Sequence, residues 1–172
     1  MSNIIIGKHT LESLTTGMYA DPYVVFREYI QNAADAIDNA VRQSLLTSDS
    51  AKIVIHLSPA EKSIIISDNG TGIHADEAEQ TLISIGNSKK TSEFDRGFRG
   101  IGRLAALGYC SKLTFETSAM SETTGTKIVI DSRKLSLLLT SKENKDVTIS
   151  EVLEQVYLVE QYQENSASHY FR

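Results

Sequence analysis

The chain has 172 residues, 41% hydrophobic and 23% charged, a composition that can bury a core without metals or disulfides and is neither collagenous nor disordered. Its net charge of −5 argues against a broad basic surface for nucleic acid, although a phosphate ligand could still bind locally. The apolar runs are too short to span a membrane, we expect no secretory signal, and the single cysteine, Cys110, excludes a disulfide scaffold and fits a reducing cytoplasm. We therefore expect one cytoplasmic domain over residues 1–172, with no membrane partner and no direct binding of nucleic acid.

A long amphipathic helix and a hairpin dominate the first half of the chain. The expected elements are, in chain order, a short helix over Thr10–Tyr19, a helix from Pro22 to about Leu46, strands over Lys52–Leu57 and Lys62–Ser67, and a helix over Ala75–Ile85. Asp21 is a suitable N-cap for the long helix, and Pro22 is tolerated in the first turn because no N–H donor is needed there. The apolar face of this helix is expected to contain Phe26, Ile30, Ala33, Ile37 and Val41.

The second half of the chain begins with a basic loop. The expected elements are a loop over Gly86–Gly100, a short helix over Ile101–Leu107, strands over Lys112–Ala119 and Thr126–Asp131, and a helix over Ser132–Leu139. A turn is expected around Thr124-Gly125, between the two strands. Thr148 and Glu151 have the spacing of a capping box for one more helix, and the tail beyond Gln155 is predicted to form strands.

Three polar residues share one stripe of the long helix, opposite the apolar face around Ile30 and Ile37. On a helix that advances about 100° per residue, Asn32 lies about 40° and Asp35 about −20° from Glu28. A solvated helix face usually carries good helix formers, often in ion pairs, yet no Lys or Arg stands between Glu28 and Val41. Polar residues that disfavour a helix indicate a bound ion or ligand here, with an ordinary solvated stripe as the alternative.

The strand ending at Ser67 runs directly into Asp68-Asn69-Gly70-Thr71-Gly72-Ile73. Asn-Gly after a strand is a common hairpin turn, but a helix start follows it in place of a second strand. We therefore interpret the glycines as positions where the backbone approaches a ligand closely. An ionised Asp68 accepts hydrogen bonds and donates none, so it could recognise an exocyclic amine.

Gly97-Phe98-Arg99-Gly100-Ile101-Gly102 opens the helix expected at Ile101. Glycine-rich turns at a helix N-terminus present N–H groups to phosphate oxygens. A dinucleotide-binding fingerprint would follow a strand directly and a Walker A loop would end in Gly-Lys-Ser/Thr, whereas here a polar loop precedes the motif and Arg103 follows it. Gly125-Thr126 is a fourth signal, which is informative only together with the other three.

In this order, the four motifs resemble the ATP-binding domain of the GHKL superfamily, which includes gyrase-type topoisomerases, 90-kDa heat-shock chaperones, sensor histidine kinases and MutL proteins. The resemblance runs from about Leu11 to Asp131. Residues Arg27–Ala36 and Gly125–Ile130 are most similar to the heat-shock chaperone branch. The resemblance implies the Bergerat fold, an α+β two-layer α/β sandwich with a mixed, mostly antiparallel sheet, helices on one face, and ATP between helices.

The resemblance also implies roles for single residues. Glu28 would be the general base for the attacking water, and Asn32 would bind Mg²⁺ through its side-chain oxygen. Asp68 would accept the adenine amino hydrogen, and Thr126 would support that contact through a water. The other implied nucleotide-binding residues are Asp35 near the adenine end, Gly70, Gly72 and Ile73 around the base, Gly97, Gly100, Ile101 and Gly102 at the phosphates, and Lys89, Lys90, Arg99 and Arg103 as candidate phosphate cations.

The implied function is Mg²⁺-dependent ATP hydrolysis, slow in the isolated domain, with residues 86–100 closing over ATP as a lid. We expect the chain to be the N-terminal part of a longer protein that dimerises through other regions and acts on a protein client. Glu28 favours hydrolysis, because histidine kinases usually place no catalytic glutamate at the start of this box. The alternatives are a nucleotide-gated binding module without turnover and a histidine-kinase-like phosphotransfer domain. Two departures from the chaperone pattern are the short stretch from Asp68 to Gly97 and Arg103 in place of an aromatic residue.

Overall fold

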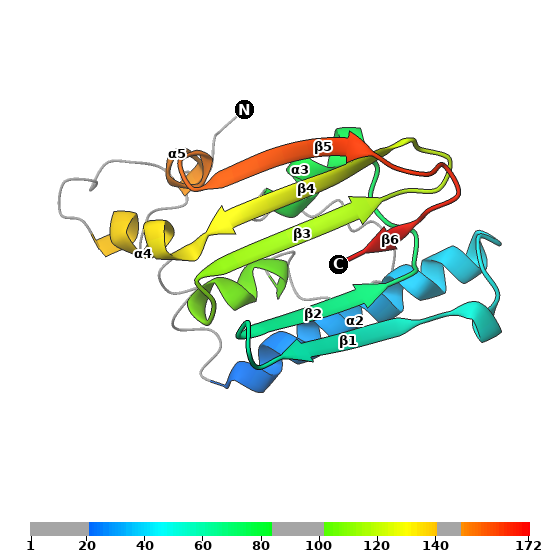
Figure 1. Ribbon diagram of the computed structural model, residues 1–172, viewed down its shortest axis with the longest axis horizontal. Coiled ribbons are helices and arrows are strands. Elements are labelled where there is room, and N and C mark those ends of the chain that lie inside the picture. Colours follow the sequence, from blue (N-terminus) through cyan, green and yellow to red (C-terminus); the bar gives the residue numbers. More distant parts are fainter. Residues whose placement is uncertain (1–20, 84–101, 141–148) are drawn as a thin grey trace, which may run out of the picture.

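The computed structural model describes residues 21–83, 102–140 and 149–172 (Figure 1). Its α-helices are α2 (Pro22–Arg42), α3 (Ala75–Ile83), α4 (Ser132–Thr140) and α5 (Ile149–Glu154), and two 3₁₀-helices are η2 (Ser48–Ser50) and η3 (Gly102–Gly108). Its strands are β1 (Ile53–Ser58), β2 (Ser63–Asp68), β3 (Lys112–Ser118), β4 (Thr124–Asp131), β5 (Tyr157–Gln163) and β6 (Tyr170–Phe171). No helix in these ranges combines the length and apolarity needed to cross a bilayer.

The strands form one sheet in the order β1-β2-β6-β3-β4-β5, and each neighbouring pair is antiparallel. Helix α2 packs on β1 and β2, while α3 and η3 contact the β3–β4 half of the sheet, and all three lie behind the sheet in Figure 1. The α+β class with helices on one face is confirmed, although every ladder in the described part is antiparallel and none makes the sheet mixed.

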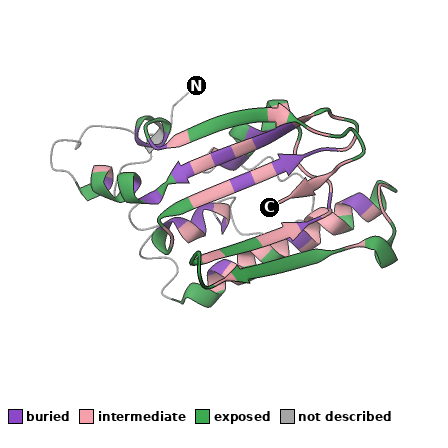
Figure 2. Ribbon diagram, in the orientation of Figure 1, coloured by how far each residue is buried: buried purple, intermediate pink, exposed green. Residues whose placement is uncertain are grey.

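The main core lies under the β3–β4 half of the sheet. Phe115, Ile128 and Ile130 point to its helix face and are at most 2% exposed. They pack with the buried side chains of η3, α4 and α5, among them Leu104 and Leu135. Figure 2 shows buried positions along β3 and β4, whereas β1 is almost entirely exposed. The sheet therefore has a well-packed half and a half that only α2 covers among the described elements.

Helix α2 starts as predicted and ends earlier than predicted. Asp21 caps it, with its carboxylate accepting the Tyr23 N–H at 2.9 Å. It ends at Arg42 rather than near Leu46, because Ser44 adopts a left-handed conformation with φ of 58°. The Leu45 N–H then bonds the Ala40 carbonyl at 2.9 Å, which is the six-to-one bond of a Schellman motif. Glycine usually occupies the left-handed position of this motif. Because Ser44 occupies it here, the sequence did not indicate that the helix ends at this point.

The other predicted elements appear within a few residues of their expected bounds. The hairpin, the helix from Ala75, both strands after Ser111, the helices at 132 and 149, and strands in the tail are confirmed. The turn predicted around Thr124-Gly125 is wrong, because β4 already begins at Thr124 and the turn lies at 119–123. The helix predicted from Ile101 is a 3₁₀-helix from Gly102. Predictions on 10–19, 86–100 and Thr148 lie outside the described residues.

Candidate functional site

Glu28 lies where α2 meets the start of η3. Its side chain is only 15% exposed, and Arg27 Nη2 lies 3.5 Å from its Oε1. A Cβ atom added to Gly102 would lie 2.6 Å from Glu28 Oε2, so the glycine backbone sits directly against the carboxylate. Two residues that the sequence placed in separate motifs therefore meet, and a side chain at position 102 would displace this carboxylate.

The backbone beside Gly102 is tied to two helices. The Tyr29 hydroxyl donates to the Arg103 carbonyl oxygen at 2.7 Å, and Arg103 Nε donates to the Leu82 carbonyl oxygen at 2.9 Å. Burial lowers the pKa of the Arg103 guanidinium to about 10. Arg103 was one of the candidate phosphate cations, but the structure directs its Nε to the end of α3.

The polar stripe of α2 flanks the buried face of the helix. The fully buried positions are Val25, Ala33 and Ala40, and Ile30 is 37% exposed, so placing the polar stripe opposite a face around Ile30 was wrong. Glu28, Asn32 and Asp35 are half-buried, and Gln31 Nε2 donates to Asp35 Oδ1 at 2.9 Å. Asp35 Oδ2 is buried and has no hydrogen-bond partner in the described part of the chain.

Asp68 ends β2 as a buried carboxyl group that is 6% exposed. Burial raises its pKa from 3.8 to about 6, although the Gly70 N–H, 2.8 Å from Oδ1, and the charge of His169 act in the opposite direction. His169 Nδ1 lies 2.6 Å from the Gly70 carbonyl oxygen, so the tautomer that donates from Nδ1 fits this contact. An acid held at this depth is unfavourable for the fold and is typical of a functional position.

The loop after Asp68 is wedged between α2 and β3. A Cβ on Gly70 would lie 2.6 Å from the Ala36 backbone, and one on Gly72, whose φ is +63°, would lie 1.9 Å from the Ser118 carbonyl oxygen. The Ile73 N–H bonds Thr117 Oγ1 at 2.8 Å. The glycines therefore allow the loop to pack closely against the helix and the strand. The sequence pattern alone had indicated positions of close approach to a ligand.

Thr126 lies directly opposite Thr117 in the β3–β4 ladder, on the helix face of the sheet. Thr126 Oγ1 and Ser118 Oγ are both buried and, like Asp35 Oδ2, have no partner among the residues that the structure describes. Buried polar atoms in folded proteins nearly always have a partner, which includes ordered water or a ligand. Thr126 and Asp35 thus have unused hydrogen-bonding capacity at two predicted site positions.

The described site residues lie on α2, in the loop 68–73, on β4 and at the start of η3, and strands β6 and β3 stand between Asp68 and Thr126 in the sheet. Glu28 contacts Gly102, and Gly70 contacts Ala36 of α2. The remaining predicted residues, Lys89, Lys90, Gly97, Arg99, Gly100 and Ile101, lie outside the described ranges. Sequence reasoning missed His169, which lies 99 positions from Gly70 and which no local motif marks.

A family model described as "Histidine kinase-, DNA gyrase B-, and HSP90-like ATPase" matches residues 22–165. The chain belongs to this ATPase family. The sequence resemblance to GHKL proteins is therefore confirmed, and the sheet with helices on one face is consistent with this family.

Relatives of this ATPase domain include three proteins named "Chaperone protein HtpG". The chain is 27% identical over 134 residues to that of Halalkalibacterium halodurans, a match covering 69% of the chain and 21% of the relative. It is 27% identical over 140 residues to that of Salinispora tropica, covering 70% and 22%. It is 37% identical over 84 residues to that of Albidiferax ferrireducens, covering 45% and 13%. The chain spans about a fifth of the length of the first of these relatives.

The donor set of this ATPase domain suits a hard cation shared with phosphates better than a protein-only metal cage. Within residues 21–83, 102–140 and 149–172, no group of three or more His, Cys, Asp or Glu could hold a metal. Mg²⁺ typically takes one or two protein oxygens and completes its shell with water and substrate phosphates. The side-chain oxygen of Asn32, half-buried one turn after Glu28, fits that pattern.

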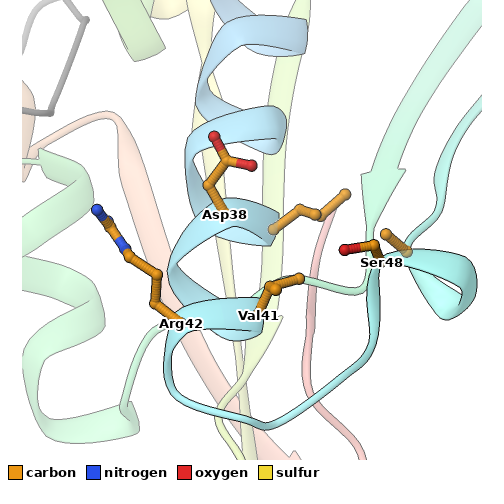
Figure 3. A pocket seen from close by; sticks show the side chains of 6 residues that line it. Asp38, Val41, Arg42 and Ser48 are labelled. Carbon is orange, nitrogen blue, oxygen red and sulfur yellow. The ribbon is translucent and has the colours of Figure 1, made fainter.

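A hollow of about 470 Å³ lies elsewhere on α2, beside its C-terminal half (Figure 3). In the close-up, Arg42 points away from Ser48, whereas Val41 lies on the side of the helix that faces Ser48. The lining residues are Ile37, Asp38, Val41, Arg42, Ser48 and Ala51. None of them belongs to the predicted site, and the hollow is a wide depression with few polar groups that converge, so it is a weak candidate for nucleotide.

Proposed function

We propose that this domain binds ATP with Mg²⁺ and hydrolyses it, with Glu28 as the general base. The observation that carries the proposal is a set of three buried polar groups in a chain of this ATPase family: the Asp68 carboxyl, and Thr126 Oγ1 and Asp35 Oδ2, which have no partner among the described residues. Uncompensated polar groups destabilise a fold unless a ligand uses them.

The adenine end of the proposed site is formed by Asp68 and Thr126. An ionised Asp68 offers an acceptor to the amino group of adenine, and Thr126 supports the same edge through a water. Because an acceptor-only group repels another acceptor, the site should discriminate against inosine triphosphate, which carries a carbonyl oxygen in place of the amino group. We expect the domain to bind inosine triphosphate at least about a hundredfold more weakly than ATP, as measured by calorimetry.

The phosphate end is formed by Glu28, Asn32 and the Gly102 backbone. Phosphoryl transfer to water requires positioning and charge neutralisation more than covalent chemistry. Bound Mg²⁺, for which Asn32 is the candidate protein ligand, would supply charge neutralisation at the phosphates. Glu28 orients the attacking water and removes its proton, and contact with Gly102 limits the positions that its carboxylate can take.

The decisive experiment is steady-state hydrolysis by the wild type and by Glu28→Gln. This substitution keeps the shape of the side chain and removes the base, so turnover should fall at least about a hundredfold while ATP affinity stays within about twofold. Glu160→Gln is the matched control, because Glu160 is exposed on β5, remote from α2 in the strand order. Equal turnover in Glu28→Gln and wild type would remove Glu28 from the reaction.

Two outcomes would replace hydrolysis with another function. ATP binding without turnover, in the chain and in a longer protein containing it, would favour a nucleotide-gated binding module. Label from γ-³²P-ATP recovered on a protein, with no free phosphate released, would favour a histidine-kinase-like phosphotransfer domain. Because the chain spans about a fifth of its HtpG relatives, dimerisation, client binding and coupling of nucleotide state to shape belong to the proposal for a longer protein.

A further inference from the structure

Glu28 and its neighbour Tyr29 contact two consecutive residues of the segment that starts η3. Glu28 Oε2 packs against Gly102, while the Tyr29 hydroxyl bonds the carbonyl oxygen of Arg103 at 2.7 Å. The tyrosine ring also packs against both hydrophobic clusters of the domain, which fixes its direction. The hydroxyl therefore holds the backbone segment that lies against the Glu28 carboxylate.

Arg103 ties the same segment to a second helix. Its Nε donates to the carbonyl oxygen of Leu82 at 2.9 Å, in the last turn of α3. A charged donor makes a stronger hydrogen bond to a carbonyl oxygen than a neutral donor does. The side chain and the carbonyl of Arg103 thus join α3 to α2, with Gly102 next to the junction.

We infer that Tyr29 and Arg103 are positioning residues that hold Gly102 against Glu28 and so fix the direction of the Glu28 carboxylate. The inference rests on the proposed function of Glu28 as the base. Neither side chain needs to touch nucleotide for this role. If either tie is lost, the Gly102 backbone can move away, the carboxylate gains alternative rotamers, and fewer molecules hold the attacking water correctly.

Tyr29→Phe tests the first tie, since it removes one hydroxyl and keeps the packed ring. We expect kcat for ATP hydrolysis to fall about three- to tenfold, with KM for ATP within about twofold of wild type. Tyr23→Phe is the matched control, because Tyr23 lies on the same helix and is 78% exposed. Its kcat should equal that of wild type.

The Glu28→Gln background separates positioning from a general structural effect. If Tyr29 acts through Glu28, Tyr29→Phe should leave the residual rate of Glu28→Gln unchanged, whereas a loss through the fold would appear in both backgrounds. The second tie is tested with Arg103→Met, which keeps much of the length and apolar stem, and Arg103→Lys, which restores a donor. We expect the methionine variant to lose kcat, the lysine variant to recover part of it, and the exposed-site control Arg133→Met to lose none.

Failure of the inference is distinguishable from failure of the proposed function. If Glu28→Gln abolishes turnover and Tyr29→Phe has wild-type kcat, the positioning role of Tyr29 is overturned, while the role of Glu28 as the general base is supported. If wild type has no turnover, NMR still tests the ties: Tyr29→Phe should shift the Gly102 amide and the Glu28 carboxyl carbon, and Tyr23→Phe should shift neither. Unchanged resonances in Tyr29→Phe would overturn the inference in that case too.

Discussion

Asp68→Asn should stabilise the free domain while removing its nucleotide affinity. Burial raises the pKa of the Asp68 carboxyl from 3.8 to about 6, so the folded state binds this proton more tightly than the unfolded chain does. This tighter proton binding stabilises the folded state. Its contribution to the free energy of unfolding is therefore fully present below about pH 3.8 and is lost as pH rises through about 6. A difference of about two pKa units corresponds to about 3 kcal/mol at neutral pH.

Asparagine keeps the acceptor for the Gly70 N–H, which Asp68 Oδ1 bonds at 2.8 Å, and never ionises. Urea unfolding at pH 7 should give Asp68→Asn a higher free energy of unfolding than wild type, by up to about 3 kcal/mol. At pH 4 the two proteins should agree within about 0.5 kcal/mol, because the aspartate is then mostly protonated in the folded state. Asp38→Asn, at an exposed position of α2, is the control and should stay within about 0.5 kcal/mol of wild type in the free energy of unfolding.

Calorimetry with ATP supplies the second half of this prediction. The asparagine amide presents a donor where the adenine amino group needs an acceptor, so affinity should fall at least about a hundredfold. An Asp68→Asn protein that is less stable than wild type at pH 7, or that binds ATP equally well, would refute the reasoning. The first result would contradict the burial penalty, and the second would remove Asp68 from base recognition.

Three further substitutions test separate contacts. Gly72→Ala should lower the free energy of unfolding by at least about 2 kcal/mol in urea titrations, because φ at this position is +63° and the new Cβ would lie 1.9 Å from the Ser118 carbonyl oxygen. A Gly72→Ala protein as stable as wild type would contradict this loop geometry. Thr126→Val should leave the free energy of unfolding unchanged or raise it by about 1 kcal/mol, since the hydroxyl lacks a partner in the described part of the chain. The same substitution should weaken ATP binding measured by thermal shift, and unchanged binding would exclude Thr126 from the site. Gly102→Ala should reduce turnover at least about tenfold, because its Cβ would displace the Glu28 carboxylate, and a normal rate would show that Glu28 works from another position.

The elements that sequence predicted well are those whose signal is local. The start of α2 follows from Asp21-Pro22 and a run of residues with helical periodicity, and the β1–β2 hairpin follows from two short Ile-rich segments. Asp68 and its glycines were predicted as a site because a turn motif preceded a helix instead of a strand. Each of these inferences needed only neighbours along the chain.

The features that sequence missed depend on contacts between distant segments. Strand β6 inserts between β2 and β3, and no local pattern in Tyr170-Phe171 indicates that position. His169 reaches the Gly70 carbonyl only because of this insertion. The link from Tyr29 to Arg103 crosses 74 positions and involves a backbone carbonyl, an atom that every residue possesses. Sequence periodicity can assign a side chain to one face of a helix or strand, but it cannot identify the residue that this side chain contacts.

The polar groups of the proposed site border the main core, and apolar burial in that core can offset their cost to the fold. The large buried cluster joins Phe115, Ile128 and Ile130 to η3, α4 and α5, and Thr126 lies on the same face of β4 as Ile128 and Ile130. The buried Asp68 carboxyl, and hydroxyl groups that have no partner among the described residues, can therefore persist, because the apolar burial of this core supplies the stability. It follows that substitutions which repair these polar groups should raise stability as they remove binding. A domain whose polar groups served only the fold would show losses in both properties together.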